Sequence, residues 1–283
     1  MSHPYGLPTH LTDLSRTLVV GVVNVTPDSF SDGGKFDTTT SAINHGLKLA
    51  RSGSDIVDVG GESTRPGAQR VTLEEELNRV IPVVEQLVAN SVVVSVDTMR
   101  AEVAKQAIAV GASMINDVSG GQADPEMFAV VAAQQVPYVM MHWRGHSAQM
   151  SEQTNYVDIV NEVKVELAMQ LAKATAAGIS AQRIVLDPGL GFAKTPEQNW
   201  PILKHIAQFA ELGLPLLVGA SRKRFLGELL ADDGHLRDVA AREAATTAIT
   251  TLLASQRVWA VRVHDVLAAR DAIAVVEKLK EQE

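Results

Sequence analysis

The chain contains no cysteine, and this absence restricts both its cross-links and its metal chemistry. A disulfide framework and a thiolate metal site are both excluded, since each requires cysteine side chains. A chain without cysteine suits the reducing cytosol. We therefore expect a cytoplasmic protein.

Long apolar runs are also missing. No stretch of about 18 uncharged apolar residues occurs, so no membrane-spanning helix is expected. The first 16 residues carry Pro4 and Pro8 and lack the basic start, apolar stretch and small-residue cleavage site of a signal peptide. We expect a soluble protein in which residues 1–16 form a short lead-in.

Positive charge is scarce: 25 lysines and arginines face 33 acidic residues, for a formal net charge of −8. Nucleic acids and anionic membranes are bound by spread lysine and arginine, so neither is expected as a partner, although a local basic site is allowed. With 283 residues, 46% of them hydrophobic, the chain can bury one large core. Because no linker or low-complexity tract divides it, we expect a single domain over residues 1–283.

Short apolar, β-branched runs alternate with segments of helical spacing. Helical spacing is seen at Leu73, Leu77, Val80, Val84 and Leu87. Nearly continuous apolar strands separated by helices indicate a parallel sheet, because each return to a parallel strand needs a crossover. The eight strand-like runs are residues 18–25, 55–60, 92–98, 114–118, 137–142, 183–187, 215–219 and 258–264.

Eight strand–helix units in about 250 residues predict a closed (β/α)8 TIM barrel. A doubly wound open sheet is the structural alternative, but that architecture does not limit the number of strands to eight. The signals expected at helix ends support the division into strand–helix units. Thr72 followed by Glu75 has the spacing of a capping box. Glycines that suit left-handed helix ends precede four of the strands, at Gly53, Gly111, Gly178 and Gly213.

Every one of the eight runs finishes with polar residues. In a barrel of this kind all strands end on one rim, so these groups converge on one mouth. Taken singly, Asp97 could cap the next helix, Asp187 could form a turn with Pro188, and Lys223 could be a solvated charge. Their occurrence at successive rim positions favours a shared site.

The predicted rim combines two kinds of chemistry. Asp97, Asn116 and Asp187 offer acceptors and an amide, which suit a flat heterocycle with adjacent amino and ring N–H groups. Cations and a glycine-rich loop suit a phosphate or diphosphate. These cations are Arg65, Lys223, Arg262 and His264. Asn24 could complete a Mg²⁺ sphere made mainly of water and phosphate oxygens.

Seven motifs in order along the chain, "NVTPDSFSDGG", "DVGGESTRPG", "SVDT", "IND", "DPGLGF", "GASRK" and "RVHD", resemble those of the dihydropteroate synthase family. The first two are long and specific, and the resemblance covers essentially the whole chain. It implies a pterin-binding (β/α)8 barrel, usually a homodimer, which is a folate-pathway transferase and sulfonamide target. The family joins 6-hydroxymethyl-7,8-dihydropterin pyrophosphate to 4-aminobenzoate and releases pyrophosphate.

The resemblance also implies roles for individual residues. It assigns the pterin to Asp97, Asn116, Asp187 and Lys223, the diphosphate to Arg262 and His264, Mg²⁺ to Asn24, and substrate contacts to Thr64 and Arg65. Asp97, Lys223 and Arg65 are the implied catalytic residues. The carboxylate of aminobenzoate is implied near the helix after Lys223, where family members differ and this chain has Arg224, so its partner stays open.

The implied mechanism is dissociative. Mg²⁺ and the cations stabilise departing pyrophosphate, while Asp97 stabilises the cationic pterin methylene. A neutral arylamine attacks such a carbon directly, so no activated serine or cysteine is needed. Closure of loops 24–37 and 60–70 is expected to exclude water.

Three alternatives stand beside this interpretation. A pterin-dependent methyl carrier uses a similar barrel and ring-binding face but has less use for diphosphate-binding cations. A Schiff-base aldolase could use Lys223, although the flanking Arg222 and Arg224 favour anion binding there. An inactive relative could retain the barrel as a binding module, but no motif residue is lost.

Overall fold

A computed structural model describes residues 3–26, 35–63, 69–146 and 152–282, without the side chains of residues 35–37. Within these ranges, eight parallel strands alternate with helices, as predicted. The strands are β1 (Leu18–Asn24), β2 (Ile56–Gly60), β3 (Val94–Asp97), β4 (Met114–Asp117), β5 (Tyr138–Met141), β6 (Ile184–Asp187), β7 (Leu217–Val218) and β8 (Ala260–Val263).

The strands form a nearly closed barrel rather than an open sheet. Their order is β6-β5-β4-β3-β2-β1-β8-β7, so the first strand pairs with the last. An isolated parallel bridge between Leu186 and Leu216 joins the region of β7 to β6. This topology confirms the (β/α)8 barrel and excludes the doubly wound alternative.

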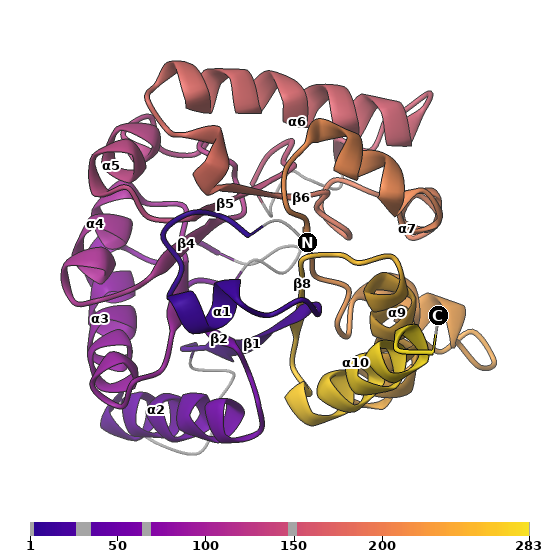
Figure 1. Ribbon diagram of the computed structural model, residues 1–283, viewed down its shortest axis with the longest axis horizontal. Helices are drawn as coiled ribbons and strands as arrows, with labels where there is room; N and C mark the ends of the chain where they lie inside the picture. Colours follow the sequence, from indigo (N-terminus) through magenta and orange to yellow (C-terminus); the bar gives the residue numbers. More distant parts are fainter. Residues whose placement is uncertain (1–2, 27–34, 64–68, 147–151, 283) are drawn as a thin grey trace.

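Helices surround the strands, and the chain passes around the ring in sequence order (Figure 1). They are α1 (Thr9–Thr12), α2 (Lys35–Arg51), α3 (Leu73–Ala89), α4 (Ala101–Ala109), α5 (Met127–Gln134), α6 (Ile159–Ala176), α7 (Asn199–Lys204), α8 (Arg224–Leu229), α9 (Glu243–Ser255) and α10 (Val266–Lys280). Short 3₁₀ turns span Ala181–Arg183, Ile206–Leu212 and Val239–Arg242.

The four predicted glycine helix ends and the Thr72 cap are confirmed, but only one of the two bonds of the predicted capping box is formed. The hydroxyl of Thr72 accepts from the backbone N–H of Glu75 at 3.1 Å and so caps α3. The Glu75 carboxylate pairs with Arg79 instead of returning to the cap. The four predicted glycines all have positive φ, between +75° and +105°, the left-handed conformation that glycine adopts at low cost.

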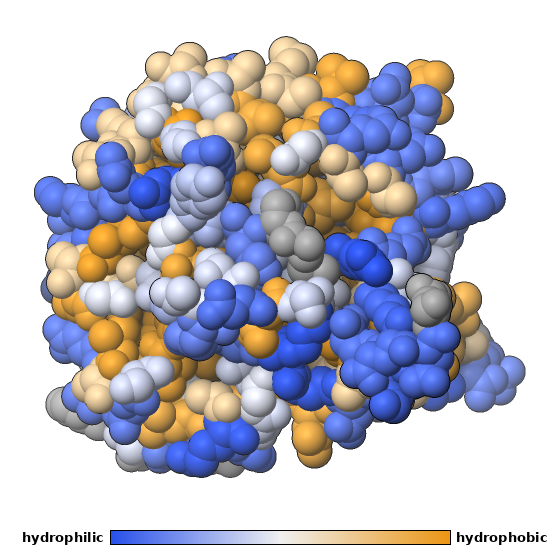
Figure 2. Space-filling model, in the orientation of Figure 1, coloured by the Kyte–Doolittle hydropathy of each residue, from blue (hydrophilic) through white to orange (hydrophobic). Residues whose placement is uncertain are grey.

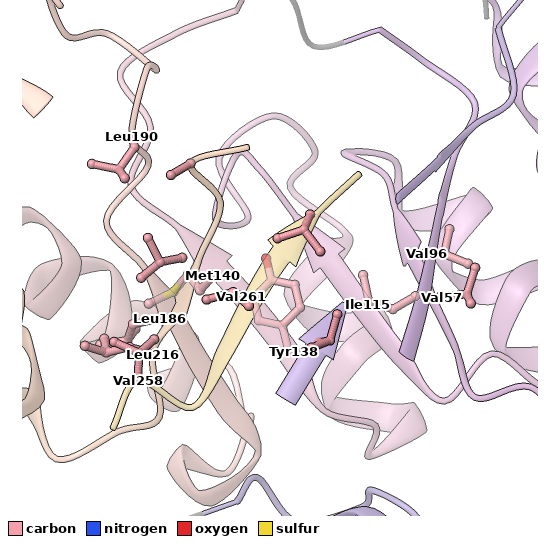
Figure 3. Packing of buried hydrophobic residues seen from close by; sticks show 14 of the residues in the cluster. Val57, Val96, Ile115, Tyr138, Met140, Leu186, Leu190, Leu216, Val258 and Val261 are labelled. Carbon is pink, nitrogen blue, oxygen red and sulfur yellow. The ribbon is translucent and has the colours of Figure 1, made fainter. Parts of the chain in front are cut away.

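Alternate strand residues pack on opposite sides of the barrel wall. Outward residues such as Val57, Val96, Ile115 and Tyr138 pack under the helices in one large cluster (Figure 3). Inward residues fill the barrel's interior: Leu18, Val20, Ile56, Met114, Val139, Val185, Leu217 and Ala260.

Part of the lead-in closes the amino end of the barrel. Leu7 and Leu11 are buried against the interior cluster, and α1 lies across this end (Figure 1). On the same face, hydrophobic residues remain visible in separate groups between hydrophilic ones (Figure 2). Among the described residues, none of the helices has the length and apolar character needed to cross a membrane. The assignment of residues 1–283 to one domain stays a prediction.

Candidate active site

The inward positions of the strands change from apolar to polar toward their carboxyl ends. In β3, for example, Ser95 and then Asp97 follow one another on the inner side. The strand register aligns Asn24 with Gly60, Gly60 with Asp97, and Asp97 with Asn116. Asn24, Gly60 and Asp97 are the last residues of their strands and Asn116 is the next to last of β4, so the carboxyl ends of β1 to β4 converge on one mouth, as predicted.

Arg262 is the centre of a buried ionic cluster at this level. Its Nε donates to Asp58 Oδ2 at 2.7 Å, and one terminal nitrogen donates to Asp97 Oδ2 at 2.9 Å. The amide nitrogen of Asn116 also donates to Asp58 Oδ2, at 3.0 Å. Both carboxylates and the amide are nearly or fully buried, so these charge-assisted bonds hold the four side chains in fixed positions.

Burial perturbs the titration of this cluster. It raises the pKa of Asp97 to about 7, against the opposing effect of Arg262, and the neighbouring charge of Asp58 raises it further. Burial also disfavours the charged form of Arg262, but Asp58 and Asp97 outweigh it, so the pKa of Arg262 is raised. The guanidinium stays charged, while Asp97 gains and loses its proton near neutral pH.

Asp58 is a site residue that the sequence prediction missed. Its Oδ1 atom is buried and, among the described residues, has no hydrogen-bond partner. A signal was present in the sequence, because Asp58 interrupts the apolar run Ile56–Gly60 at an inward position. A carboxylate at such a position points to the interior of the barrel.

Asp187 and Lys223 form the opposite side of the mouth. Asp187 is the buried last residue of β6, and its Oδ1 accepts from the backbone N–H of Gly189 at 2.7 Å. The residue therefore both shapes the predicted turn and contributes a buried carboxylate. Burial raises the pKa of Asp187, and the Lys223 ammonium opposes this rise.

Lys223 reaches the same region from the start of α8. Its ammonium donates to the carbonyl of Leu190 and lies 4.8 Å from the centre of the Phe192 ring. Burial lowers the pKa of Lys223 to about 8, although Asp187 opposes the shift. This lysine is therefore held by its neighbours and is not a solvated charge at a helix start.

An apolar patch lies among these polar groups. Met99, Val118 and Met141 form a buried cluster, against which Phe192 packs. Met141 is in register with Asp187 on the next strand. A site with apolar side chains beside a few fixed polar groups suits a flat ring.

His264 follows the end of β8, and Arg224 is the first residue of α8. The Nδ1 atom of His264 is 2.9 Å from the hydroxyl of Ser221, which also accepts from the backbone N–H of His264 at 3.2 Å. Arg224 is exposed, and its Nε donates to Glu228 one helical turn away, at 2.7 Å. Its guanidinium is thus directed along α8.

Asn24 ends β1 with its side chain half-buried and, within the described residues, without a hydrogen bond. The same part of the chain contains no group of three or more histidine or acidic side chains able to hold a metal. A neutral amide oxygen without a carboxylate cage fits a Mg²⁺ ion that keeps water and phosphate ligands.

Two predicted site residues, Thr64 and Arg65, lie outside the described residues. Asp97 does not cap the following helix. The first helical residue, Ala101, instead donates its N–H to Asp124 Oδ2 at 2.8 Å. The simpler interpretation of Asp97 as a cap is therefore wrong.

A parallel barrel with buried acids, an amide and cations at the carboxyl ends of its strands defines an α/β-barrel enzyme. Residues 20–264 match the family model described as "Pterin binding enzyme". The chain is 50% identical over 265 residues to the dihydropteroate synthase of Mycobacterium leprae (strain TN), and the match covers 93% of each chain.

Solved structures agree with these matches. The Xanthomonas albilineans dihydropteroate synthase with 4-aminobenzoic acid aligns with a TM-score of 0.87 at 45% identity, over 94% of this chain and 93% of that one. The same enzyme in complex with 7,8-dihydropteroate aligns with a TM-score of 0.84 at 42% identity, over 94% of both chains. The chain therefore belongs to the pterin-binding enzyme family, and within it to the dihydropteroate synthases, which are transferases.

Proposed function

We propose that the protein condenses 6-hydroxymethyl-7,8-dihydropterin pyrophosphate with 4-aminobenzoate to give 7,8-dihydropteroate and pyrophosphate. The observation that carries this proposal is the buried cluster of Asp58, Asp97, Asn116 and Arg262 opposite Asp187 and Lys223. The Xanthomonas structures with 4-aminobenzoic acid and 7,8-dihydropteroate support it.

The pterin is proposed to bind by its polar edge. Asp97 and Asp187 accept from its amino and ring N–H groups, while Asn116 and Lys223 donate to its ring nitrogen and oxygen atoms. The ring then rests against the apolar patch of Met141, Val118 and Phe192. Recognition costs little reorganisation, because internal hydrogen bonds already hold these side chains.

The proposed chemical step breaks the bond between the pterin methylene carbon and the pyrophosphate oxygen. The electron pair leaves with pyrophosphate, and the methylene carbon becomes cationic. The ionised form of Asp97 stabilises this cation. The amine lone pair then forms the new C–N bond, and the nitrogen releases its proton to solvent.

Arg262 and His264 are proposed to bind the departing diphosphate. Two carboxylates already hold Arg262, which fixes the direction of its guanidinium while their negative charge reduces its net attraction for an anion. One terminal nitrogen of Arg262 has no hydrogen bond among the described residues and suits a phosphate oxygen.

Mg²⁺ is proposed as the cofactor, with Asn24 as its protein ligand. When bound, the ion supplies charge stabilisation to the diphosphate oxygens. Calorimetric titration of the protein with Mg²⁺ and pyrophosphate together tests this assignment. Asn24→Ala is expected to weaken the joint binding, and equal heats for both proteins would contradict it.

The decisive experiment is an assay of pyrophosphate release. We expect release only when the pterin substrate and 4-aminobenzoate are both present. Release without the amine would indicate hydrolysis. Methyl transfer from a tetrahydropterin would favour the methyl carrier, and borohydride trapping of Lys223 with a carbonyl substrate would favour the aldolase.

We also propose a homodimer and a cytoplasmic location. Four large apolar side chains are strongly exposed on α9 and α10: Leu252 62%, Leu267 59%, Val275 59% and Leu279 67%. Exposed apolar residues on two helices that pack together favour association with a second copy through this face. The absence of cysteine suits a cytosolic location, which fractionation of cells tests.

Sedimentation equilibrium tests the proposed dimer. Leu267→Glu on α10 is expected to shift the protein toward the monomer. Val165→Glu is the matched control, because Val165 is a similarly exposed apolar residue on α6. Equal masses for both variants and the unmodified protein would contradict the proposed face.

A further inference from the structure

A second buried ionic group lies behind the mouth, and the mechanism proposed above does not use it. Lys194, in the segment between β6 and α7, is only 8% exposed. Its Nζ atom lies 3.0 Å from each of three acceptors: His142 Nδ1 and the carbonyl oxygens of Gly189 and Phe192. An ammonium group has three N–H donors, and here all three are used.

The group continues from Lys194 to α6. The other ring nitrogen of His142, Nε2, lies 3.0 Å from Glu166 Oε2. Arg144 donates to both carboxylate oxygens of Glu166. Along the cluster, Lys194 is a cation, His142 a neutral ring, Glu166 an anion and Arg144 a cation. These contacts place the ring hydrogen of His142 on Nε2, which donates to Glu166, so that Nδ1 accepts from Lys194. We call these four residues the Lys194 cluster.

The charge states of His142 and Glu166 agree with this assignment. Burial and the Lys194 charge lower the pKa of His142 to about 4, so the ring is neutral at pH 7. Burial disfavours the Glu166 anion, but His142 and Arg144 outweigh it and lower its pKa to about 2. Burial lowers the pKa of Lys194 to about 7, whereas its three acceptors suit the ammonium form.

The segment that Lys194 holds also contacts Lys223. Between the two carbonyls bound by Lys194 lie Leu190, whose carbonyl accepts from Lys223, and Gly191, where an added Cβ would lie 3.2 Å from the Lys223 side chain. The ring of Phe192 is 4.8 Å from the Lys223 ammonium. Residues 189–192 thus connect the two lysines.

The position of this segment allows little adjustment. Gly189 has a φ of +69°, and an added Cβ would lie 2.5 Å from the carbonyl oxygen of His142, a backbone atom. The backbone N–H of His142 donates to the Asp187 carbonyl at 2.8 Å. The turn after β6 is therefore packed directly on the end of β5, where the Lys194 cluster begins.

We propose that Lys194 is a positioning residue for the pterin-binding site: its bonds to His142, Gly189 and Phe192 fix residues 189–192 in the conformation that holds Lys223. This proposal deepens the proposed function and rests on it for the identity of the ligand. Lys194 touches no reacting atom in this arrangement, and its effect passes through Lys223.

The first test replaces Lys194 by methionine, which keeps a similar length and removes the charge. We expect the dissociation constant for the pterin substrate to rise roughly tenfold, as the loss of charge-assisted hydrogen bonds implies. The KM for 4-aminobenzoate is expected to change much less. The matched control is Lys164→Met, since Lys164 pairs with Glu211 at the surface of α6.

A double-mutant cycle separates positioning from general loss of structure. If Lys194 acts through Lys223, Lys194→Met weakens pterin binding in the unmodified protein but has little further effect in a Lys223→Met background. Equal weakening in both backgrounds, or equal affinities for the Lys194 and Lys164 variants, would overturn the proposal. If Lys194→Met does not fold, Glu166→Gln is used, with a smaller shift in the same direction.

A second measurement does not depend on the pterin. Acetylation of Lys223 by an amine-reactive reagent is followed by mass spectrometry, and Lys194→Met is expected to accelerate it several-fold by releasing the Leu190 carbonyl. An unchanged rate contradicts the positioning role even if the protein proves to have another substrate. Failure of pyrophosphate release in the unmodified protein contradicts the proposed function alone.

Discussion

Replacing Asp58 by asparagine tests the ionic cluster most directly. The substitution neutralises a fully buried carboxylate that accepts from both Arg262 and Asn116. Removing one partner of a buried ion pair costs about 3–5 kcal/mol when the other charge is left uncompensated. Arg262 keeps Asp97 as a partner at 2.9 Å, so we expect the free energy of unfolding to fall by about 3 kcal/mol, at the lower end of this range.

The same substitution is also expected to shift the pH dependence of activity in a defined direction. Burial raises the pKa of Asp97 to about 7, Arg262 opposes the rise, and the charge of Asp58 adds to it. With asparagine at position 58, the like charge is gone and Arg262 pairs with Asp97 alone. Both changes lower the pKa of Asp97, by roughly one unit.

Catalysis needs ionised Asp97, so kcat/KM of the unmodified enzyme is expected to rise with pH through about 7. This rise is the acid limb of the pH–activity profile, and in Asp58→Asn it is expected to move to lower pH. The measurement is pyrophosphate release over a range of pH, together with urea unfolding.

Asp55→Asn is the matched control. Asp55 binds Arg16 through two contacts of 2.8 and 2.7 Å at the opposite end of the barrel. This control is expected to reduce the free energy of unfolding without moving the acid limb. An acid limb in Asp58→Asn that stays in place, or moves to higher pH, would refute the coupling between the two carboxylates.

Three further predictions concern the groups around the mouth. Asp97→Asn is expected to keep the fold by circular dichroism and to lower kcat by about 100-fold or more, the scale of losing one electrostatic stabiliser; near-native turnover would remove Asp97 from the mechanism. Arg262→Ala is expected to weaken pyrophosphate binding more than 4-aminobenzoate binding, and calorimetry showing unchanged pyrophosphate affinity would contradict it. Activity is expected to fall as pH rises through about 8, because Lys223 loses its proton there. If a Lys223→Arg variant shows the same fall at the same pH, the loss of activity is due to another group.

Much of the architecture could be predicted from residue patterns alone. All eight strands were expected, and their observed bounds differ from the predicted runs only at the ends, as in β3 with Val94–Asp97 against residues 92–98. Strands and helices are set by local periodicity, by caps such as Thr72, and by glycines before strands. Each of these signals acts over a few residues, so each is visible in the sequence.

The candidate site was only partly predictable. Asp97, Asn116 and Asp187 could be identified because each ends an apolar run. Asp58 was missed as a site residue, since its role depends on Arg262, 204 residues further along the chain. Lys194 and its contact with His142 gave no signal that local spacing could reveal.

By itself, the sequence determined the alternation of strands and helices and the kinds of polar group at the strand ends. Only the tertiary structure decided which charges meet, because pairing depends on the register between strands and on the closure of β1 against β8. Arg262 thereby lies between carboxylates of β2 and β3, and Lys194 reaches the end of β5. Buried charges so placed require partners at hydrogen-bond distance, and the folded barrel supplies them.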